Sequence, residues 1–267
     1  PFVPAEDGRD VMMNTVGPVW DGNETWLVLG GAAVMAAFPL VYSVVLSALY
    51  LPLVFMLLGL ILRGVAFEFR FKSHDHERHL WDKAFILGSL SASFFQGVAL
   101  GAYIQGIPVV DRAFAGGPFD WVAPFPLFTG LGVVVAYALL GSTWLILKTE
   151  GSLQAAMIRV TRPLLWVLLG FIVAVSVWTP LSQESIARRW FTLPNTIFFS
   201  PVPLLVAFFS LRLWRSLQGE PHAAPFLYVL GLVFLGYTGL GISLWPMVIP
   251  PDVTLWDAAA PLQSQGF

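Results

Sequence analysis

The 267-residue chain is 57% hydrophobic and 11% charged, with a mean hydropathy of +0.76 and a formal net charge of −2. Soluble domains usually carry about a quarter charged residues, so the composition excludes an ordinary soluble protein, and the charge excludes a nucleic-acid partner. The absence of cysteine excludes disulfides and thiolate metal ligands.

Uncharged runs fill most of the chain, in the order 25–62, 84–110, 121–147, 163–183, 190–211 and 221–251. A helix needs about 20 apolar residues to cross the hydrocarbon core of a bilayer. The first run is too long for one such helix, and Tyr50-Leu51-Pro52 is expected to divide it, whereas each later run supplies one. The sequence therefore predicts an all-α, polytopic membrane protein: one membrane domain, residues 1–267, with seven transmembrane helices.

The distribution of basic residues predicts the orientation. On one side of the membrane the predicted loops carry ten Lys and Arg residues, and on the other side they carry three: Arg112, Arg188 and Arg189. Basic loops face the cytoplasm in multi-pass proteins. The opening segment is therefore predicted to be cytoplasmic.

Metal chemistry finds little support in the sequence. The four histidines, His74, His76, His79 and His222, fall in predicted loops or at a helix edge, whereas a haem iron would need an imidazole within the bundle. The run HDHERH, residues 74–79, has no ligand spacing typical of a metal site and favours a solvated loop. We expect this chain to bind no haem and no metal.

Asp21 and Glu24 are the ionisable residues at the mouth of the first long apolar run, which contains no further charge until Arg63. Their spacing is typical of a capping box, in which Asp21 would cap the helix and Glu24 would reach back to it. Carboxylates at the edge of a membrane interior are also hypotheses for proton or ion paths. The spacing alone favours neither interpretation.

Several motifs together resemble a known family. They are NTVGPVWDGNETWL at 14–27, Ala37-Phe38-Pro39, RGVAFEFR at 63–70, GGPFDW at 116–121 and PPDVTLWDAA at 250–259. These motifs resemble subunit II of cytochrome bd-type quinol oxidases, most closely the cyanide-insensitive branch. Members have nine helices, so the resemblance implies that this chain is a fragment lacking the first and last helices.

The resemblance also implies a function, a location in the bacterial cytoplasmic (inner) membrane and a set of site residues. Subunit I would carry haems b and d, or b-type variants, and would bind quinol, while this subunit would stabilise it and line a cytoplasmic proton path. In this chain Asp21 and Glu24 would lie on that path, although Glu24 replaces an amide found in other members. Residues supporting the site or contacting the partner would be Trp20, Asn23, Arg78, Trp81 and Asp82.

Other partners and functions stay open. Membrane lipid is an expected partner, and the resemblance leaves a structural quinone and a small accessory subunit as alternatives to be considered. A secondary transporter would need a substrate site at broken helices near the membrane midplane. A purely structural assembly subunit would use Asp21 only as a helix cap.

The predicted orientation can be tested directly, because the chain has no cysteine of its own. In intact cells, an impermeant thiol reagent should label this chain when Ser264 is replaced by cysteine and should leave it unlabelled when Ala5 is replaced. The opposite pattern would mean that the topology is inverted.

Overall fold

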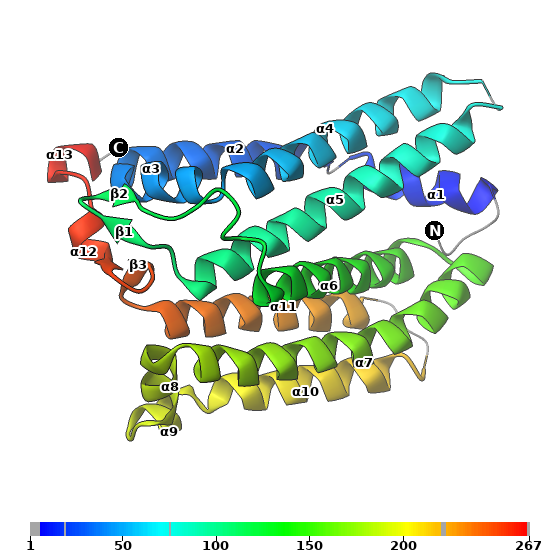
Figure 1. Ribbon diagram of the computed structural model, residues 1–267. Coiled ribbons are helices and arrows are strands. Elements are labelled where there is room, and N and C mark those ends of the chain that lie inside the picture. The colour runs from blue at the N-terminus through cyan, green and yellow to red at the C-terminus, as the bar shows by residue number, and fades with distance from the viewer. Residues whose placement is uncertain (1–5, 19, 75, 220–222, 266–267) are drawn as a thin grey trace. The chain divides into compact units, whose positions relative to one another are not determined.

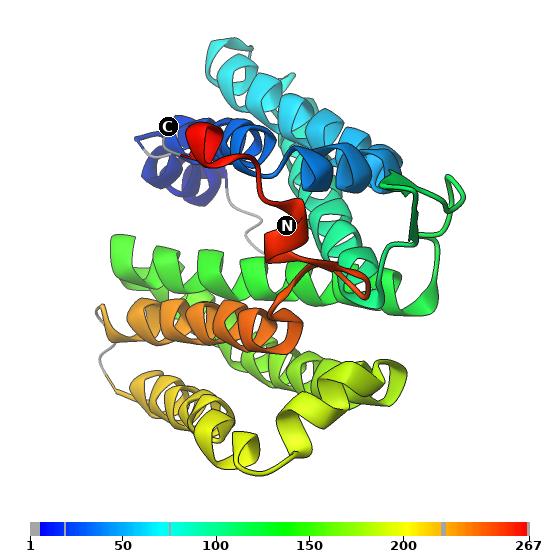
Figure 2. The ribbon, with the colours of Figure 1, turned by 90° about the vertical axis from the view of Figure 1, so that its left-hand side faces the viewer.

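The computed structural model in Figures 1 and 2 describes residues 6–18, 20–74, 76–219 and 223–265. Two short antiparallel strand pairs, β1 (Val109–Val110) with β2 (Ala113–Phe114) and β3 (Met247–Ile249) with β4 (Val253–Thr254), interrupt a helical structure. The helices are α1 (Glu6–Val16), α2 (Trp20–Ala37), α3 (Pro39–Ala48), α4 (Tyr50–Lys72), α5 (Arg78–Gln105), α6 (Pro124–Lys148), α7 (Gly151–Ser182), α8 (Glu184–Phe191), α9 (Asn195–Phe199), α10 (Pro201–Ser216), α11 (Ala224–Leu244), α12 (Leu255–Ala258) and α13 (Leu262–Gln265).

Within the described ranges, six helical stretches are long and apolar enough to cross a membrane: α4, α5, α6, α7, Asn195–Ser216 and α11. The prediction of an all-α, polytopic membrane protein is therefore confirmed. The number differs from the seven predicted, because the first apolar run forms three helices. Its first part consists of two shorter apolar stretches, Glu24–Ala37 and Pro39–Ala48.

Prolines explain where the first run divides. The backbone leaves helical torsion angles at Phe38 (φ −139°, ψ 65°), because the ring of Pro39 disfavours the helical conformation in the residue before it. It deviates again at Leu49 (φ −105°, ψ 17°), directly before the predicted break at residues 50–52. There Pro52 has no N–H to donate to the carbonyl of Ala48.

The chain divides into two compact units. Unit 1 consists of Pro1–Val16 and Val135–Trp245, and unit 2 consists of Gly17–Val134 and Pro246–Phe267. Each unit therefore combines an early and a late segment of the chain.

In unit 2, α4 and α5 form a long antiparallel hairpin (Figure 1) whose helices approach closely at two glycines. A Cβ atom on Gly59 would lie 2.7 Å from the backbone nitrogen of Ala92, and one on Gly88 would lie 2.7 Å from the nitrogen of Arg63. Beside this crossing, Phe55 stacks on Phe95 with ring centroids 4.9 Å apart. Small residues here permit backbone-to-backbone packing, as is common between membrane helices.

A second close approach in unit 2 joins α5 to the start of α6. A Cβ on Gly97 would lie 2.8 Å from the Cα of Gly130, and one on Gly101 would collide with the hydroxyl of Thr129. Residues 97 and 101 form a small-xxx-small pair, so both glycines lie on the same face of α5.

The C-terminal segment closes one end of unit 2. The amide of Ile107 donates to the carbonyl of Pro250 (2.8 Å), and the hydroxyl of Tyr103 donates to the carbonyl of Val248 (2.5 Å). The amide of Ala260 donates to the carbonyl of Ala37 at the end of α2 (2.9 Å). Beneath these bonds lies a buried cluster that includes Val44, Ala99 and Ile249.

Unit 1 packs around a buried cluster contributed by α6, α7, α10 and α11, which includes Leu139, Leu165, Leu213 and Val229. The hydroxyl of Thr161, which is fully buried, donates to that of Ser142 (2.8 Å) and ties α7 to α6. Buried polar groups of this kind need such partners, because an unmade hydrogen bond in an apolar core is costly.

Two features of unit 1 were not predicted from the sequence pattern. α7 begins at Gly151, well before the uncharged run 163–183, so Arg159 and Arg162 are helical. At the other end, α8 and α9 form the turn between α7 and α10 (Figure 2), and the indole of Trp190 donates to the hydroxyl of Ser243 in α11 (2.8 Å).

The α4–α5 crossing yields a prediction. Replacing Gly59 or Gly88 with alanine places a methyl group against backbone atoms of the facing helix, and overpacking of this kind costs roughly 1–3 kcal/mol. The protein purified from membranes should therefore melt at a lower temperature. Gly170→Ala and Gly236→Ala are matched controls, because no atom lies within 4 Å of a Cβ at either position. Equal melting temperatures for both pairs of variants would contradict the packing assigned to this crossing.

Candidate functional site

The acidic residues singled out in the sequence lie in the first turns of α2. Since α2 begins at Trp20 among the described residues, Asp21 is its second residue and not the N-cap that a capping box requires. An acid in this turn still interacts favourably with the positive end of the helix dipole. The side chains of Trp20, Asp21 and Asn23 lie outside the described residues.

Glu24, one turn further along α2, forms an ion pair with Arg63 of α4. Its Oε1 accepts a hydrogen bond from Nη2 of Arg63 at 2.9 Å, and both side chains are about one-third exposed. The backbone of Arg63 lies at the close crossing with Gly88, so the α4–α5 packing fixes the position from which Arg63 reaches α2.

A second ion pair joins α4 to α5. Nε of Arg70 donates to Oδ1 of Asp82 at 2.6 Å, and the Arg70 and Asp82 side chains are 1% and 11% exposed. A buried arginine needs such a partner, since the desolvation of an unpaired charge costs several kcal/mol. Asp82 therefore has a defined structural role at the start of α5.

The other two predicted supporting residues also lie in the first turn of α5. The ring of Trp81 stacks on Phe69 of α4, with centroids 5.2 Å apart and planes inclined by 30°. Arg78 is the first residue of the helix and is half-buried. The structure thus brings Trp81 and Asp82 against α4, while Glu24 lies against a different part of the same helix.

Two arginines of α4, Arg63 and Arg70, form the two ion pairs described above. They are seven residues apart on α4, which places them on the same helix face at roughly 10 Å along the axis. Each is bound to an acid from a neighbouring helix, Arg63 to α2 and Arg70 to α5. Ionisable groups paired inside a membrane bundle are candidates for functional sites.

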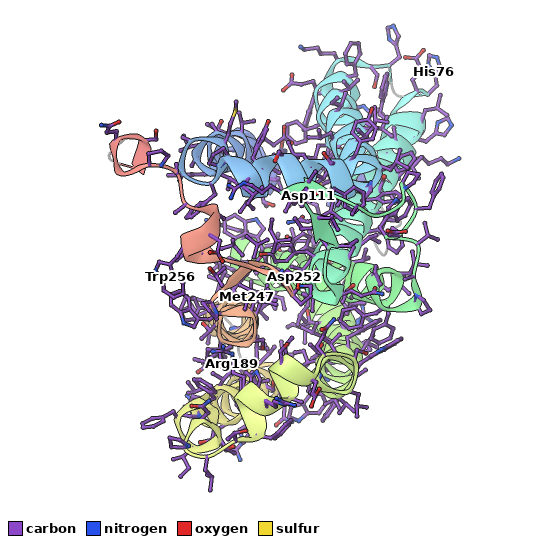
Figure 3. The ribbon with its side chains drawn as sticks, turned by 60° about the vertical axis from the view of Figure 1, so that its left-hand side comes forward. His76, Asp111, Arg189, Met247, Asp252 and Trp256 are labelled. Atoms are coloured by element: carbon purple, nitrogen blue, oxygen red, sulfur yellow. The ribbon has the colours of Figure 1, made fainter. Side chains whose placement is uncertain are left out.

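The tip of the α4–α5 hairpin has a different character. His76 lies at this tip, as Figure 3 shows, and its Nε2 is 3.7 Å from the carboxylate of Glu77. Lys72 and Glu68 form an exposed i,i+4 pair at 3.6 Å. Among the described residues no group of three His, Cys, Asp or Glu side chains could hold a metal ion; His222 lies outside these residues.

Sequence reasoning identified the acids but missed their partners. In the sequence Arg63 is conspicuous only as the first charge after the long apolar run, and Arg70 only as part of the motif RGVAFEFR. Arg70 is nevertheless the most deeply buried charged residue in the described structure. The available signal was that Arg63 and Arg70 share a helical face within the aromatic run RGVAFEFR.

Comparisons with known proteins agree with this architecture. The family model for cytochrome bd terminal oxidase subunit II matches residues 1–267. The chain is 34% identical to the probable cytochrome oxidase subunit 2 of Haemophilus influenzae, over 94% of this chain and 76% of that protein. It is 31% identical to cytochrome bd ubiquinol oxidase subunit 2 of Bacillus subtilis, over 90% and 70%. It is 28% identical to the cytochrome bd-I ubiquinol oxidase subunit 2 of Escherichia coli, over 94% and 76%. The chain therefore belongs to the cytochrome bd terminal oxidase subunit II family.

Proposed function

We propose that this chain is the non-haem subunit of a quinol oxidase complex that couples quinol oxidation to the reduction of oxygen to water. Membership of the family implies a partner, subunit I, and a multi-pass location in the membrane. In this proposal subunit I holds the haems and the quinol site, and the cofactors carry the redox chemistry. The present chain stabilises subunit I and delivers protons from the cytoplasm.

The observation that carries the proton-delivery proposal is the difference between the two acids at the start of α2. Glu24 is held in an ion pair with Arg63 and so serves as a link between α2 and α4. Asp21 precedes it by almost one turn and is the second residue of an 18-residue helix that is uncharged after Glu24. Proton transfer needs a group that can change its charge at the edge of a region that excludes water. We assign this role to Asp21 from its position at the start of a helix that is uncharged after Glu24.

Two other functions were considered. A secondary transporter is disfavoured, because the family to which the chain belongs comprises oxidase subunits. A purely structural subunit differs from our proposal in one respect, namely that Asp21 would not need to titrate. The two can be separated by a substitution that removes the proton-binding group and preserves hydrogen bonding.

Asp21→Asn provides that separation. Asparagine retains a polar side chain in the first turn of α2, and the lost interaction with the helix dipole costs only about 0.3–1 kcal/mol. We expect the complex to assemble with normal haem content and to lose most of its quinol oxidase turnover, measured as oxygen consumption per haem.

Glu24→Gln is the matched control. Its side-chain oxygen can still accept the hydrogen bond from Arg63, so α2 and α4 remain linked and the effect on turnover should be much milder. Near-normal turnover in a fully assembled Asp21→Asn complex would refute proton delivery through Asp21 and leave the structural role.

The stabilising role depends on the Arg70–Asp82 pair. Asp82→Ala leaves the Arg70 charge buried without this partner, a change that typically costs about 3–5 kcal/mol. We expect a lower melting temperature of the purified complex and less haem recovered with it. Lys72→Ala, which breaks an exposed pair on the same helix, should have little effect, since exposed pairs contribute about 0–1 kcal/mol. Comparable losses in the two variants would contradict this assignment.

A further inference from the structure

One end of unit 1 carries a group of basic side chains that the proposed function does not use. We call it the basic belt, and it consists of the last residue of α6 (Lys148), two residues in the first half of α7 (Arg159 and Arg162) and two near the end of α10 (Arg212 and Arg215). All five side chains are exposed. In Figure 1 the α6–α7 connection and the last turn of α10 lie at the same end of this unit.

The basic belt has no ion-pair partner among the described residues, unlike the basic residues of α4. Arg63, Arg70 and Lys72 each pair with an acid, whereas none of the five belt residues forms an ion pair with another described residue. The acidic residues near the belt in sequence are Glu150 and Glu220, and Glu220 lies outside the described residues.

The contacts that the belt does make are to neutral groups. Nη2 of Arg162 donates to the carbonyl of Leu217 at the end of α10 (2.8 Å), and Nε of Arg212 donates to the hydroxyl of Tyr228 (3.2 Å). The ammonium of Lys148 lies 4.9 Å from the centroid of the Trp144 ring. Arg159 and Arg215 make no hydrogen bond to any described residue. These contacts orient three of the cations, and none of them places a described carboxylate beside the charge.

Residues of the belt also lie at the borders of the apolar segments of α7 and α10. Arg162 directly precedes the uncharged run 163–183, and Arg212 directly follows the run 190–211, so both mark the limit of the apolar part of their helix. At the same level Trp166, which is 59% exposed, packs against Trp214 with centroids 5.4 Å apart. Tryptophan with flanking arginine is typical of the headgroup region of a bilayer.

From these observations we infer that the basic belt is a binding site for anionic phospholipid. The guanidinium groups of α7 and α10 bind the headgroup phosphate, for which the planar donors of arginine are well suited. Trp166 packs beside the upper acyl chains. The lipid headgroups thereby supply the negative charge that no described acid supplies to the belt through an ion pair.

The inference can be tested on the intact oxidase complex in neutral detergent–phosphatidylcholine micelles titrated with phosphatidylglycerol, with bound lipid counted by native mass spectrometry. The test variant is Arg159→Gln/Arg215→Gln. It spares Arg162, which also holds the end of α10, and it removes no hydrogen bond within the described structure. Each basic residue near an anionic surface contributes roughly a fivefold change in affinity, so the tightest phosphatidylglycerol should bind about 25-fold more weakly.

Two further variants serve as controls. Arg188→Gln/Arg189→Gln removes the same charge from α8, at the opposite end of α7, and should leave the tightest binding unchanged. Arg159→Lys/Arg215→Lys keeps the charge and should retain most of the affinity.

Three results would overturn the inference. The first is unaltered phosphatidylglycerol binding by the Arg159→Gln/Arg215→Gln variant. The second is displacement of the lipid by excess inorganic phosphate, which would identify a site for free anions. The third is release of subunit I from this variant with lipid binding intact, which would identify an acidic protein surface as the occupant.

Discussion

The structure of unit 2 depends on one constraint: a cation inside a low-dielectric helix bundle requires an anion beside it. Arg70 is almost completely buried, and its Nε donates a hydrogen bond to Oδ1 of Asp82 at 2.6 Å across the α4–α5 hairpin. The pair fixes the register of the two helices near their connection, and the Gly59–Gly88 crossing fixes it further along. Arg63 lies at that crossing, so its reach to Glu24 of α2 follows from the same packing. The packing of α4 against α5 therefore positions Arg63, and Arg63 in turn binds Glu24 in the first turns of α2.

Composition and run length were sufficient to predict the class of fold, because a membrane imposes a minimum length on apolar helices. They could not predict every boundary. Phe38 leaves the helical region because of the residue that follows it, although the hydrophobic run continues without interruption. Likewise α7 begins at Gly151, within a segment whose charges suggested a loop; its buried residues Met157 and Thr161 pack against the rest of unit 1 and stabilise helix there.

The candidate site was predictable only in part. Asp21 and Glu24 are conspicuous in the sequence because so few charges accompany them. The partners of Glu24 and Asp82 are 39 and 12 residues away in the sequence and are selected by helix packing, which no local pattern specifies. The resemblance of RGVAFEFR to the family identified the segment containing both arginines but gave neither of them a role. The basic residues Arg63, Arg70 and Lys72 of α4 have acidic partners, whereas no belt residue of unit 1 forms an ion pair with a described acid.

The closure of unit 2 by the C-terminal segment bears on the biosynthesis of the protein. Helices α2 to α5 leave the ribosome before the rest of unit 2, and the carbonyls of Val248 and Pro250, which bind Tyr103 and Ile107, follow roughly 140 residues later. At about 5–20 residues per second, translation takes roughly 7–30 s to supply them. During that interval the nascent unit 2 is open at one end while all of α6 to α11 is being inserted. A premature stop just before residue 246 would therefore leave a chain with all of its long membrane helices but with unit 2 incomplete.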